Sequence, residues 1–416
     1  MNKKLVFEKH NNFNTIVINF YFPFTLKDKD IASLAILPSL LVKTNKNYPN
    51  ENLFRRKLID SLIIDMYCLF KRIGKERFLV FSLTIPDQKT IKEDILKESL
   101  KFFINTIYEP NIKNNQFDSK YFEIKKSDLE LRIKNNLANV DFYNDYRLLQ
   151  IVDPNGESTR IIENHQEQLK DLNPTTTYEF YKKIVLEKLP FIFVVGDVEK
   201  TKLESLFDEL LFKNKPHNKI EKINYNFTDY LTKIKTNIIK EKGPYNQSCL
   251  SYVYKVKDMH FNDTPYLKIV NLLLSSTSSN LLMDSLRTEG KLVYYAGSYI
   301  YTHNGLLIIE ARIGSKSYKE AKKRIEETFD KLKDQQIIKP LLTNVKKQLY
   351  LDLIRAQDNK YYFLNQLINC QTFKCSMNLN EEYEIIKNMT TKDIANFIKR
   401  LELDTIYYLE GEKDAA

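Results

Sequence analysis

The same order of predicted elements occurs twice along the 416-residue chain, and this internal repeat constrains the fold more than any other feature. Towards the end of the first half, Thr176 to Glu179 has the spacing of a capping box, which predicts a helix start. An apolar strand is predicted soon after, at 191–195. Near the C-terminus, Thr390 to Asp393 has a looser form of the same spacing, and a strand is predicted at 405–409. The two halves therefore end with the same pair of elements.

The halves also begin alike. Residues 14–22 alternate apolar and polar side chains, which predicts a half-buried strand, and an apolar helix is predicted from about Ile31. Residues 247–256 alternate in the same way, and a helix is predicted to begin near Thr264. In both halves the strands are grouped rather than strictly alternating with helices. This grouping indicates the α+β class.

We therefore predict two homologous domains, each a mainly antiparallel β-sheet with helices packed on one face. The chain is too long for one ordinary core, so the N-terminal domain is placed at 1–211 and the C-terminal domain at 236–416. The segment 212–235 is polar, rich in lysine and without a sustained apolar period, so it is the predicted linker.

The composition and the N-terminal sequence indicate the cellular compartment of the protein and the state of its cysteines. Apolar residues make up 43% of the chain, but no apolar run approaches the roughly 20 residues needed to span a bilayer. The N-terminus lacks the continuous apolar segment of a signal peptide, so we expect a cytoplasmic protein without membrane insertion. The four cysteines form no pair of Cys-x-x-Cys motifs, which predicts reduced, mostly buried thiols rather than a zinc or disulfide framework. They are Cys68, Cys249, Cys370 and Cys375.

The net charge of +10 invites a nucleic-acid interpretation, but the lysines do not support it. They are scattered and interleaved with acidic residues, as at 120–134 and 316–333, which is typical of solvated helix faces. The chain has no glycine-rich phosphate loop, zinc finger or aromatic-basic strand. We expect no nucleic-acid partner, although a positive field would favour acidic peptides or an acidic partner subunit.

One short segment resembles a known motif. Residues 285–295 read Ser-Leu-Arg-Thr-Glu-Gly-Lys-Leu-Val-Tyr-Tyr and join an apolar helix predicted at 267–286 to a strand predicted at 292–301. The segment resembles a signature in the second domain of insulinase-type zinc peptidases, with Arg287 and Tyr294 at its Arg and Tyr positions. In that family these two side chains hold a peptide in the active site of the partner half. The resemblance therefore implies a substrate-binding role for both residues.

The resemblance extends over nearly the whole chain, although no single motif in it is highly specific. Phe191 to Val198 matches the apolar strand followed by Gly-Asp-Val that ends the first sheet in the family. Gln247 matches a glutamine before the first strand of the second half, and Ser278-Ser279 matches serines near the end of the following helix. The resemblance therefore rests on the order and spacing of these segments along the chain.

The catalytic motif of the family is absent. Active members carry His-x-x-Glu-His on the first helix of the first half, where the histidines bind zinc and the glutamate activates the metal-bound water. The resemblance places Ala35, Pro38 and Ser39 at the histidine, glutamate and histidine positions of this degenerate zinc motif. No pair among His10, His165, His217, His260 and His303 lies three or four residues apart. We therefore expect no metal and no catalytic residue in this chain.

The resemblance then implies a non-catalytic subunit of a heterodimeric zinc peptidase. Its partner would be a homologous subunit that bears the zinc and cleaves peptides, as in the two-chain mitochondrial processing peptidase. Two alternatives stay open: a binding or assembly protein that keeps only the fold, and a self-sufficient peptidase with an unrecognised metal site. For Arg287 a helix C-terminus is a sufficient structural explanation, and for Tyr294 ordinary strand packing is sufficient.

Overall fold

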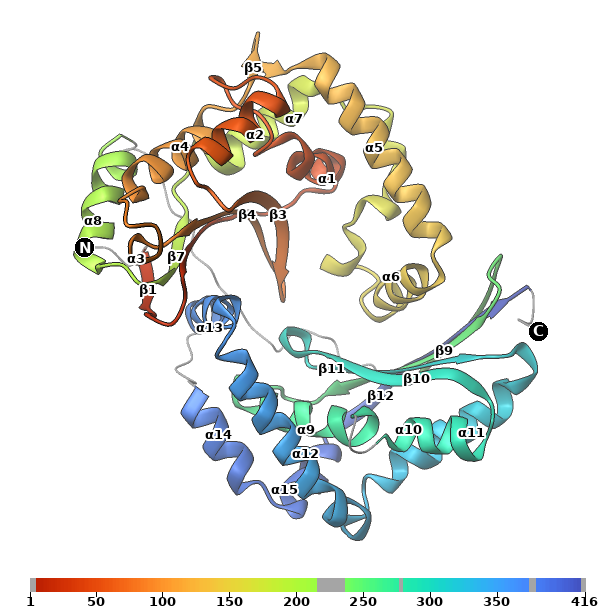
Figure 1. Cartoon of the computed structure of the whole chain (residues 1–416). Helices are drawn as coiled ribbons and strands as arrows, with labels where there is room; N and C mark the ends of the chain where they lie inside the picture. The colour runs from red at the N-terminus through yellow and green to blue at the C-terminus, as the bar shows by residue number, and fades with distance from the viewer. Residues whose placement is uncertain (1–4, 215–235, 277–279, 374–378, 413–416) are drawn as a thin grey trace. The chain divides into compact units, whose positions relative to one another are not determined.

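The computed structural model describes residues 5–214, 236–276, 280–373 and 379–412 (Figure 1). The chain divides into two compact units, and each is discontinuous in sequence. Unit 1 contains Met1–Asn135, Arg160–Tyr225 and Gln357–Lys374. Unit 2 contains Asn136–Thr159, Asn226–Ala356 and Cys375–Ala416. Each unit therefore takes one segment from the opposite half of the chain.

The sheet of unit 1 has five strands in the order β1-β7-β2-β4-β3. These are β1 (Leu5–Lys9), β2 (Thr15–Pro23), β3 (Asp65–Ile73), β4 (Glu76–Pro86) and β7 (Phe191–Gly196). β1 runs parallel to β7, and every other pair in the sheet is antiparallel. The strands are rich in β-branched and aromatic residues, which suit a pleated, buried surface.

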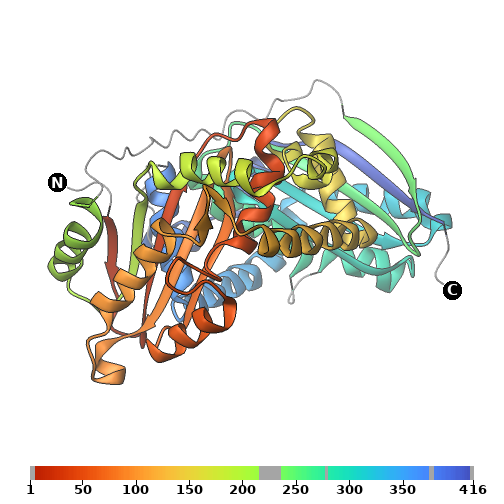
Figure 2. The same cartoon turned by 90° about the horizontal axis from the view of Figure 1, so that it is seen from above.

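Helices follow these strands in unit 1. They are α1 (Ile31–Leu40), α2 (Glu51–Asp60), α3 (Gln88–Ile91), α4 (Leu96–Tyr108), α5 (Ser119–Ala138), α7 (Pro174–Tyr181), α8 (Lys200–Phe207) and α13 (Lys360–Phe373). Two π-helical turns, Lys182–Leu186 and Asp208–Phe212, extend α7 and α8, and a small hairpin joins β5 (Ile112–Lys113) to β6 (Gln116–Phe117). Figure 2 shows α5 as one long helix.

The sheet of unit 2 repeats this topology in the order β10-β11-β9-β12-β8. Its strands are β8 (Asn237–Gly243), β9 (Ser248–Val256), β10 (Val293–Tyr301), β11 (Leu306–Ile313) and β12 (Leu401–Gly411). β8 and β12 are the parallel pair, so β12 is the equivalent of β7. The predicted duplication and the α+β class are both confirmed by this correspondence.

The helices of unit 2 complete the repeat. They are α6 (Val140–Val152), α9 (Thr264–Ser275), α10 (Leu281–Met283), α11 (Tyr318–Lys331), α12 (Gln335–Ala356), α14 (Leu379–Asn388) and α15 (Thr391–Ile398). A π-helical turn at Asp284–Glu289 follows α10. Short 3₁₀ turns lie at Asp28–Asp30, Glu157–Thr159, Ile162–Asn164, Gln166–Leu169, Phe261–Asp263, Thr302–Asn304 and Ser315–Ser317.

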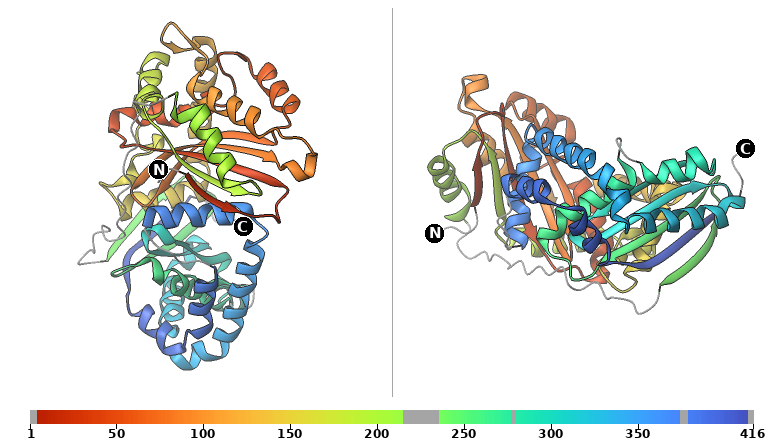
Figure 3. Two further views of the ribbon diagram at one scale, coloured as in Figure 1. Left: turned by 90° about the vertical axis from the view of Figure 1, so that its left-hand side faces the viewer. Right: turned by 90° about the horizontal axis from the view of Figure 1, so that it is seen from below.

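Each sheet has a main helical layer on one face. In unit 1 the ring of Phe20 on β2 packs against Phe103 of α4, with centroids 5.0 Å apart, and against Phe207 of α8. In unit 2 one apolar cluster joins the strands to α9, α11, α12 and α15, which lie over the sheet in Figure 3. These two layers hold most of the core, because a sheet stabilises a domain by burying its apolar face against helices.

The second face of each sheet is covered by the helix from the opposite half of the chain. In unit 1, α13 packs on β7 and β1, and Lys71 of β3 donates hydrogen bonds to Asn365 of α13 (2.9 Å) and Tyr21 of β2 (3.3 Å). In unit 2, α6 packs on β12 and β9. The strands predicted to be half-buried, 14–22 and 247–256, are therefore buried almost throughout, and that prediction was wrong.

Other local predictions had mixed outcomes. α15 begins with the predicted capping box, because Thr390 and Asp393 exchange hydrogen bonds. α7 is instead capped by Asn173, whose side chain accepts from the N–H groups of Thr175 and Thr176, so the predicted box at Thr176 to Glu179 was wrong. An asparagine followed by proline makes the stronger helix start.

The continuous helix predicted at 267–286 is also corrected by the structure. α9 ends at Ser275, and Ser276 is extended. The hydroxyl of Ser275 accepts from the backbone N–H of Ser298 on β10 at 3.0 Å, which ties the helix end to the sheet. Serine side chains compete with helical hydrogen bonding in this way. Ser278, Ser279, Cys375, His217 and the predicted linker from 215 to 235 lie outside the described residues.

Candidate functional site

The degenerate zinc motif lies on the accessible face of α1. Seven of the ten residues of this helix are buried, and the remaining three are Ala35, Pro38 and Ser39. A spacing of three and four residues places them on one side of the helix. These three residues are therefore the part of α1 that a ligand could reach, and their side chains determine what this face can bind.

None of the three side chains offers a free metal ligand. Ala35 has no ligand atom, and Pro38 has neither a ligand atom nor a backbone N–H. The hydroxyl of Ser39 donates to the carbonyl oxygen of Ile36 at 2.7 Å, so it is engaged within its own helix.

Helix α5, which lies beside α1 in Figure 1, brings a cation to this face. Arg132 Nη2 donates to the carbonyl oxygen of Ala35 at 3.3 Å. The Tyr121 hydroxyl donates to Glu51 Oε1 at 2.7 Å and lies 3.3 Å from the carbonyl oxygen of Ser39. A guanidinium beside the Ala35 carbonyl raises the local positive potential, which disfavours a divalent cation there.

Glu51 is the acidic side chain in contact with this group, and it is already paired. Its carboxylate accepts from Tyr121 and lies 3.1 Å from Lys125 Nζ. The Tyr121 hydrogen bond and, after it, Lys125 hold the pKa of Glu51 below its ordinary value. A carboxylate stabilised in its charged form is a poor general base, so this arrangement does not replace the glutamate of an active zinc site.

The described residues contain no group of three or more histidine, cysteine or acidic side chains that could hold a metal ion. His10 bonds to Glu8 at 2.9 Å and packs against Phe363, and His165 Nδ1 lies 3.0 Å from the carbonyl oxygen of Ile161. These two rings are engaged in separate local contacts. Cys68, Cys249 and Cys370 are free thiols.

The second candidate pair, Arg287 and Tyr294, lies in unit 2. Arg287 is in the π-helical turn Asp284–Glu289, a geometry that occurs frequently at functional sites, and its side chain is exposed. Tyr294 is on β10 and is 66% exposed. Neither side chain has a hydrogen-bond, ion-pair or ring partner among the residues that the structure describes. The proximity of both side chains to one common ligand is a prediction from the sequence.

The backbone between them forms a tight turn. Lys291 has a positive φ of 53° and its N–H donates to the carbonyl oxygen of Arg287, while the N–H of Leu292 donates to that of Leu286. A β-bulge between Val293 and Tyr295 then takes Tyr294 out of the ladder of β10 with β11. Bulges redirect side chains in this way, which explains why Tyr294 is exposed in a strand that is otherwise paired.

Arg324 of α11 fixes the turn from the other side. Its guanidinium donates to the carbonyl oxygen of Ser285 at 3.1 Å and lies 3.5 Å from the carboxylate of Glu289. Gly290 allows this close approach, because a Cβ there would lie 2.9 Å from the carbonyl oxygen of Leu286 and 3.2 Å from Arg324 Nε. The segment that presents Arg287 is therefore held by tertiary contacts.

A buried ionic cluster between β11 and α6 was not predicted from the sequence. Arg312 pairs with Glu310, two residues earlier on β11, and with Asp141 of α6. The Tyr299 hydroxyl donates to Asp145 of α6. Glu310 and Arg312 are 6% and 8% exposed. The sequence did contain a signal for this cluster. Glu310 and Arg312 are charged residues within the apolar run 306–313, and a spacing of two places them on the same face of a strand.

Burial dominates the electrostatics of this cluster. It raises the pKa of Glu310 to about 7, although Arg312 opposes the shift, and it raises the pKa of Asp145 as well. The thiol of Cys249, which contacts Arg312, has a pKa raised to about 12 by burial. This thiol is therefore protonated at neutral pH and has no nucleophilic role.

The fold and these two sites define a class of protein: a duplicated α+β chain whose motif face in unit 1 offers no free metal-ligand side chain and whose unit 2 has an exposed Arg–Tyr turn. Residues 171–349 match the model of the Peptidase M16 inactive domain. A relative from Bacillus subtilis (strain 168), described as the probable inactive metalloprotease YmfF, is 23% identical over 411 residues, covering 98% of this chain and 96% of the relative. The chain is therefore similar to the insulinase-type, or M16, peptidases.

Solved structures show the same fold. A conserved protein from Enterococcus faecalis V583 superposes with a TM-score of 0.89 at 22% identity, over 99% of this chain and 97% of that one. The periplasmic protease PqqL from Escherichia coli superposes with a TM-score of 0.68 at 10% identity. That match covers 95% of this chain but 42% of PqqL, so the present fold corresponds to less than half of that protease. No helix among the described residues is long and apolar enough to cross a membrane.

Proposed function

We propose that this chain is the non-catalytic subunit of a heterodimeric zinc peptidase. The partner is a homologous subunit that carries His-x-x-Glu-His and the zinc ion and cleaves peptides. This chain contributes Arg287 and Tyr294 to substrate binding in the active site of that partner. The observation that carries the proposal is the contrast between the two sites: the motif face of α1 has no free ligand, whereas Arg287 and Tyr294 are exposed and have no partner among the described residues.

The coverage of one longer protease also supports the proposal. The present fold corresponds to 42% of PqqL. We infer that the homologous partner provides the counterpart of the unmatched part of such a protease.

The chemistry of the exposed pair suits a peptide ligand. The planar guanidinium of Arg287 can pair with a backbone carbonyl or a carboxylate through two parallel hydrogen bonds. The hydroxyl of Tyr294 can donate to the oxyanion that develops when the scissile carbonyl is attacked. A single donor of this kind contributes about 10²–10³ in rate when it is preorganised.

Two further assignments belong to this proposal. We infer that this chain holds no zinc of its own, because Ala35, Pro38 and Ser39 provide no free ligand and Arg132 bonds beside them. We also infer residence in the cytoplasm, where free thiols such as Cys68, Cys249 and Cys370 stay reduced.

The test is reconstitution with the zinc-bearing homologue. The partner should copurify with this chain, and the purified complex should contain about one zinc, bound to the partner. Arg287→Ala and Tyr294→Phe should leave pairing intact and reduce turnover of a short peptide by about 10²–10³-fold. Arg355→Ala removes another exposed arginine, and Tyr295→Phe removes the adjacent hydroxyl, so these variants are the matched controls.

The outcomes separate the alternatives. A complex whose turnover is unaffected by both substitutions would leave this chain as a binding or assembly protein that keeps the fold. Peptide cleavage by the isolated chain, with one tightly bound zinc after dialysis, would support the self-sufficient peptidase instead.

A further inference from the structure

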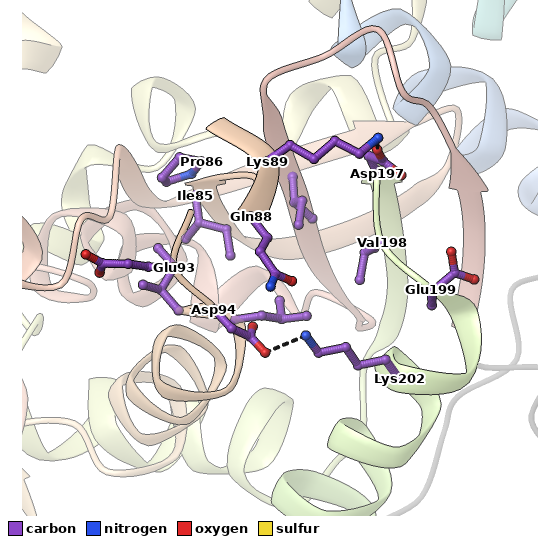
Figure 4. Close-up of a pocket in the computed structure, with 13 residues that line it drawn as sticks. Ile85, Pro86, Gln88, Lys89, Glu93, Asp94, Asp197, Val198, Glu199 and Lys202 are labelled. Carbon is purple, nitrogen blue, oxygen red and sulfur yellow. Dashed lines mark hydrogen bonds and ion pairs between the residues drawn. The ribbon is translucent and has the colours of Figure 1, made fainter. Parts of the chain in front are cut away.

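A cavity of about 350 Å³ lies in unit 1 (Figure 4). The chain leads into α1 from one end of the sheet, and the cavity lies at the opposite end. It is lined by Ile16 at the start of β2, by Ile85 at the end of β4 and by Val198 just after β7. α1 follows the other end of β2, Pro23, which is seven residues from Ile16 along that strand. A strand rises about 3.3 Å per residue, so the cavity lies far from the degenerate zinc motif. The two are separate sites.

One part of the cavity wall is apolar. Ile16, Ile85, Leu96 and Val198 are all buried, with exposures between 0 and 8%, and Pro86 and Ile95 complete this apolar part. The rest of the lining is polar or charged and includes Glu93 and Glu199. Burial of apolar area here would contribute about 25 cal/mol per Å² to the binding of an aliphatic group.

Two ion pairs border this apolar surface. Asp94, just before α4, pairs with Lys202 of α8 at 2.6 Å, and Lys89 of α3 pairs with Asp197, just after β7. Asp197 is largely buried, and the hydrogen bond from Lys89 holds its pKa below the ordinary value. Figure 4 shows the amide of Gln88 pointing into the space between the two pairs. This amide has no partner among the described residues.

We propose that this cavity binds a small zwitterion with an aliphatic side chain, which is either a free branched amino acid or a dipeptide. The aliphatic side chain lies against Ile16, Ile85 and Val198. The α-ammonium group pairs with Asp94, and the α-carboxylate pairs with Lys202.

Charge balance selects this class of ligand. A zwitterion that enters between Asp94 and Lys202 gives each of them a new partner of opposite charge. An amine alone would pair only with Asp94, and a carboxylate alone would pair only with Lys202, so each would form one ion pair where a zwitterion forms two. The cavity volume is near the lower end of the range for small-molecule sites, which excludes a long peptide.

The proposal is tested by calorimetric titration of the full chain with L-leucine. We expect saturable binding, with at least about tenfold weaker affinity for glycine, 4-methylpentanoate and isoamylamine, which lack the side chain, the ammonium group and the carboxylate respectively. Titration with leucyl-leucine distinguishes the two sources, because the better-fitting ligand binds more tightly.

Variants complete the test. Lys202→Met and Asp94→Asn should each weaken leucine binding at least about tenfold while the thermal unfolding temperature stays close to wild type, since this pair is partly exposed. Lys113→Met breaks a comparable surface pair, Lys113–Asp118, and should leave binding unchanged. The proposal is overturned if neither L-leucine nor leucyl-leucine binds, if glycine or 4-methylpentanoate binds as well as leucine, or if both cavity variants bind like the wild type. None of these results bears on Arg287 and Tyr294.

Discussion

At the scale of single residues, the side chains that matter most here have unusual surroundings for their chemistry. Tyr294 is a large aromatic residue in a strand and yet is 66% exposed, because a bulge takes it out of the ladder. Glu310 is an acid and yet is 6% exposed, on the face of β11 that α6 covers. Burial of a carboxyl group favours its protonated form, so Glu310 connects the stability of unit 2 to pH.

The sign of this pH dependence follows from the raised pKa. Glu310 titrates near 7 in the folded protein and near 4.5 when unfolded. As the pH rises between these values the unfolded state loses its proton first, so the folded state loses relative stability. Its neighbours act in both directions: Arg312 lowers the pKa of Glu310, whereas Asp141 and Asp145 of α6 raise it.

We therefore predict that Glu310→Gln removes the loss of folding stability that Glu310 causes as the pH rises. The free energy of unfolding of the variant relative to wild type should rise by about 2–3 kcal/mol between about pH 5 and about pH 8. Chemical denaturation at both pH values measures it. Glu327→Gln on the exposed face of α11 is the control and should show no such change. A constant difference between Glu310→Gln and wild type at the two pH values would contradict the prediction.

At the scale of elements, a local sequence pattern predicted the structure correctly where the side chain concerned bonds within its own helix. The box of Thr390 and Asp393 begins α15 as predicted. The helix predicted at 267–286 was wrong because Ser275 bonds to Ser298 on β10, a residue more than twenty positions away. Spacing in the sequence reports on hydrogen bonds within a turn and not on bonds to another strand.

The cap of α15 gives a prediction at this scale. Thr390→Ala should lower the free energy of unfolding by about 1 kcal/mol, because the N–H of Asp393 loses its acceptor, whereas Thr390→Ser should retain most of the stability. Denaturant titration measures both. Thr391→Ala is the matched control, because it removes the hydroxyl of the next residue, which lies 3.4 Å from Gln335 Oε1 and takes no part in the cap. Equal stability of Thr390→Ala and Thr390→Ser would show that the cap contributes nothing.

At the scale of the whole molecule, the exchange of α6 and α13 joins the two halves. The first half contributes α6 to unit 2, where Asn144 donates to Ser251 of β9 at 3.0 Å and Arg147 pairs with Glu241 of β8. The second half contributes α13 to unit 1, where Phe363 contacts His10 and Phe13. Each unit therefore has a complete core only when both halves are present.

This reciprocity predicts the behaviour of a split protein. Residues 1–214 and 236–416, expressed as two separate chains in one cell, should copurify as a one-to-one complex, and either chain alone should aggregate or unfold at a lower temperature. Phe363→Asp should weaken the association, because it places a charge against His10 and Phe13, whereas Glu381→Asp on α14 should not. Two independently stable and non-associating chains would show that the exchanged helices are dispensable.

The sequence by itself determined the duplicated α+β architecture and the equivalence of the strands at 191–195 and 405–409. These features follow from periodicity and order, which act along the chain. Only the tertiary structure decided that α6 and α13 are exchanged, that Glu310 and Arg312 are buried together, and that Ile16, Ile85 and Val198 line one cavity. These features depend on contacts between residues far apart in sequence, for which the local pattern carries no information.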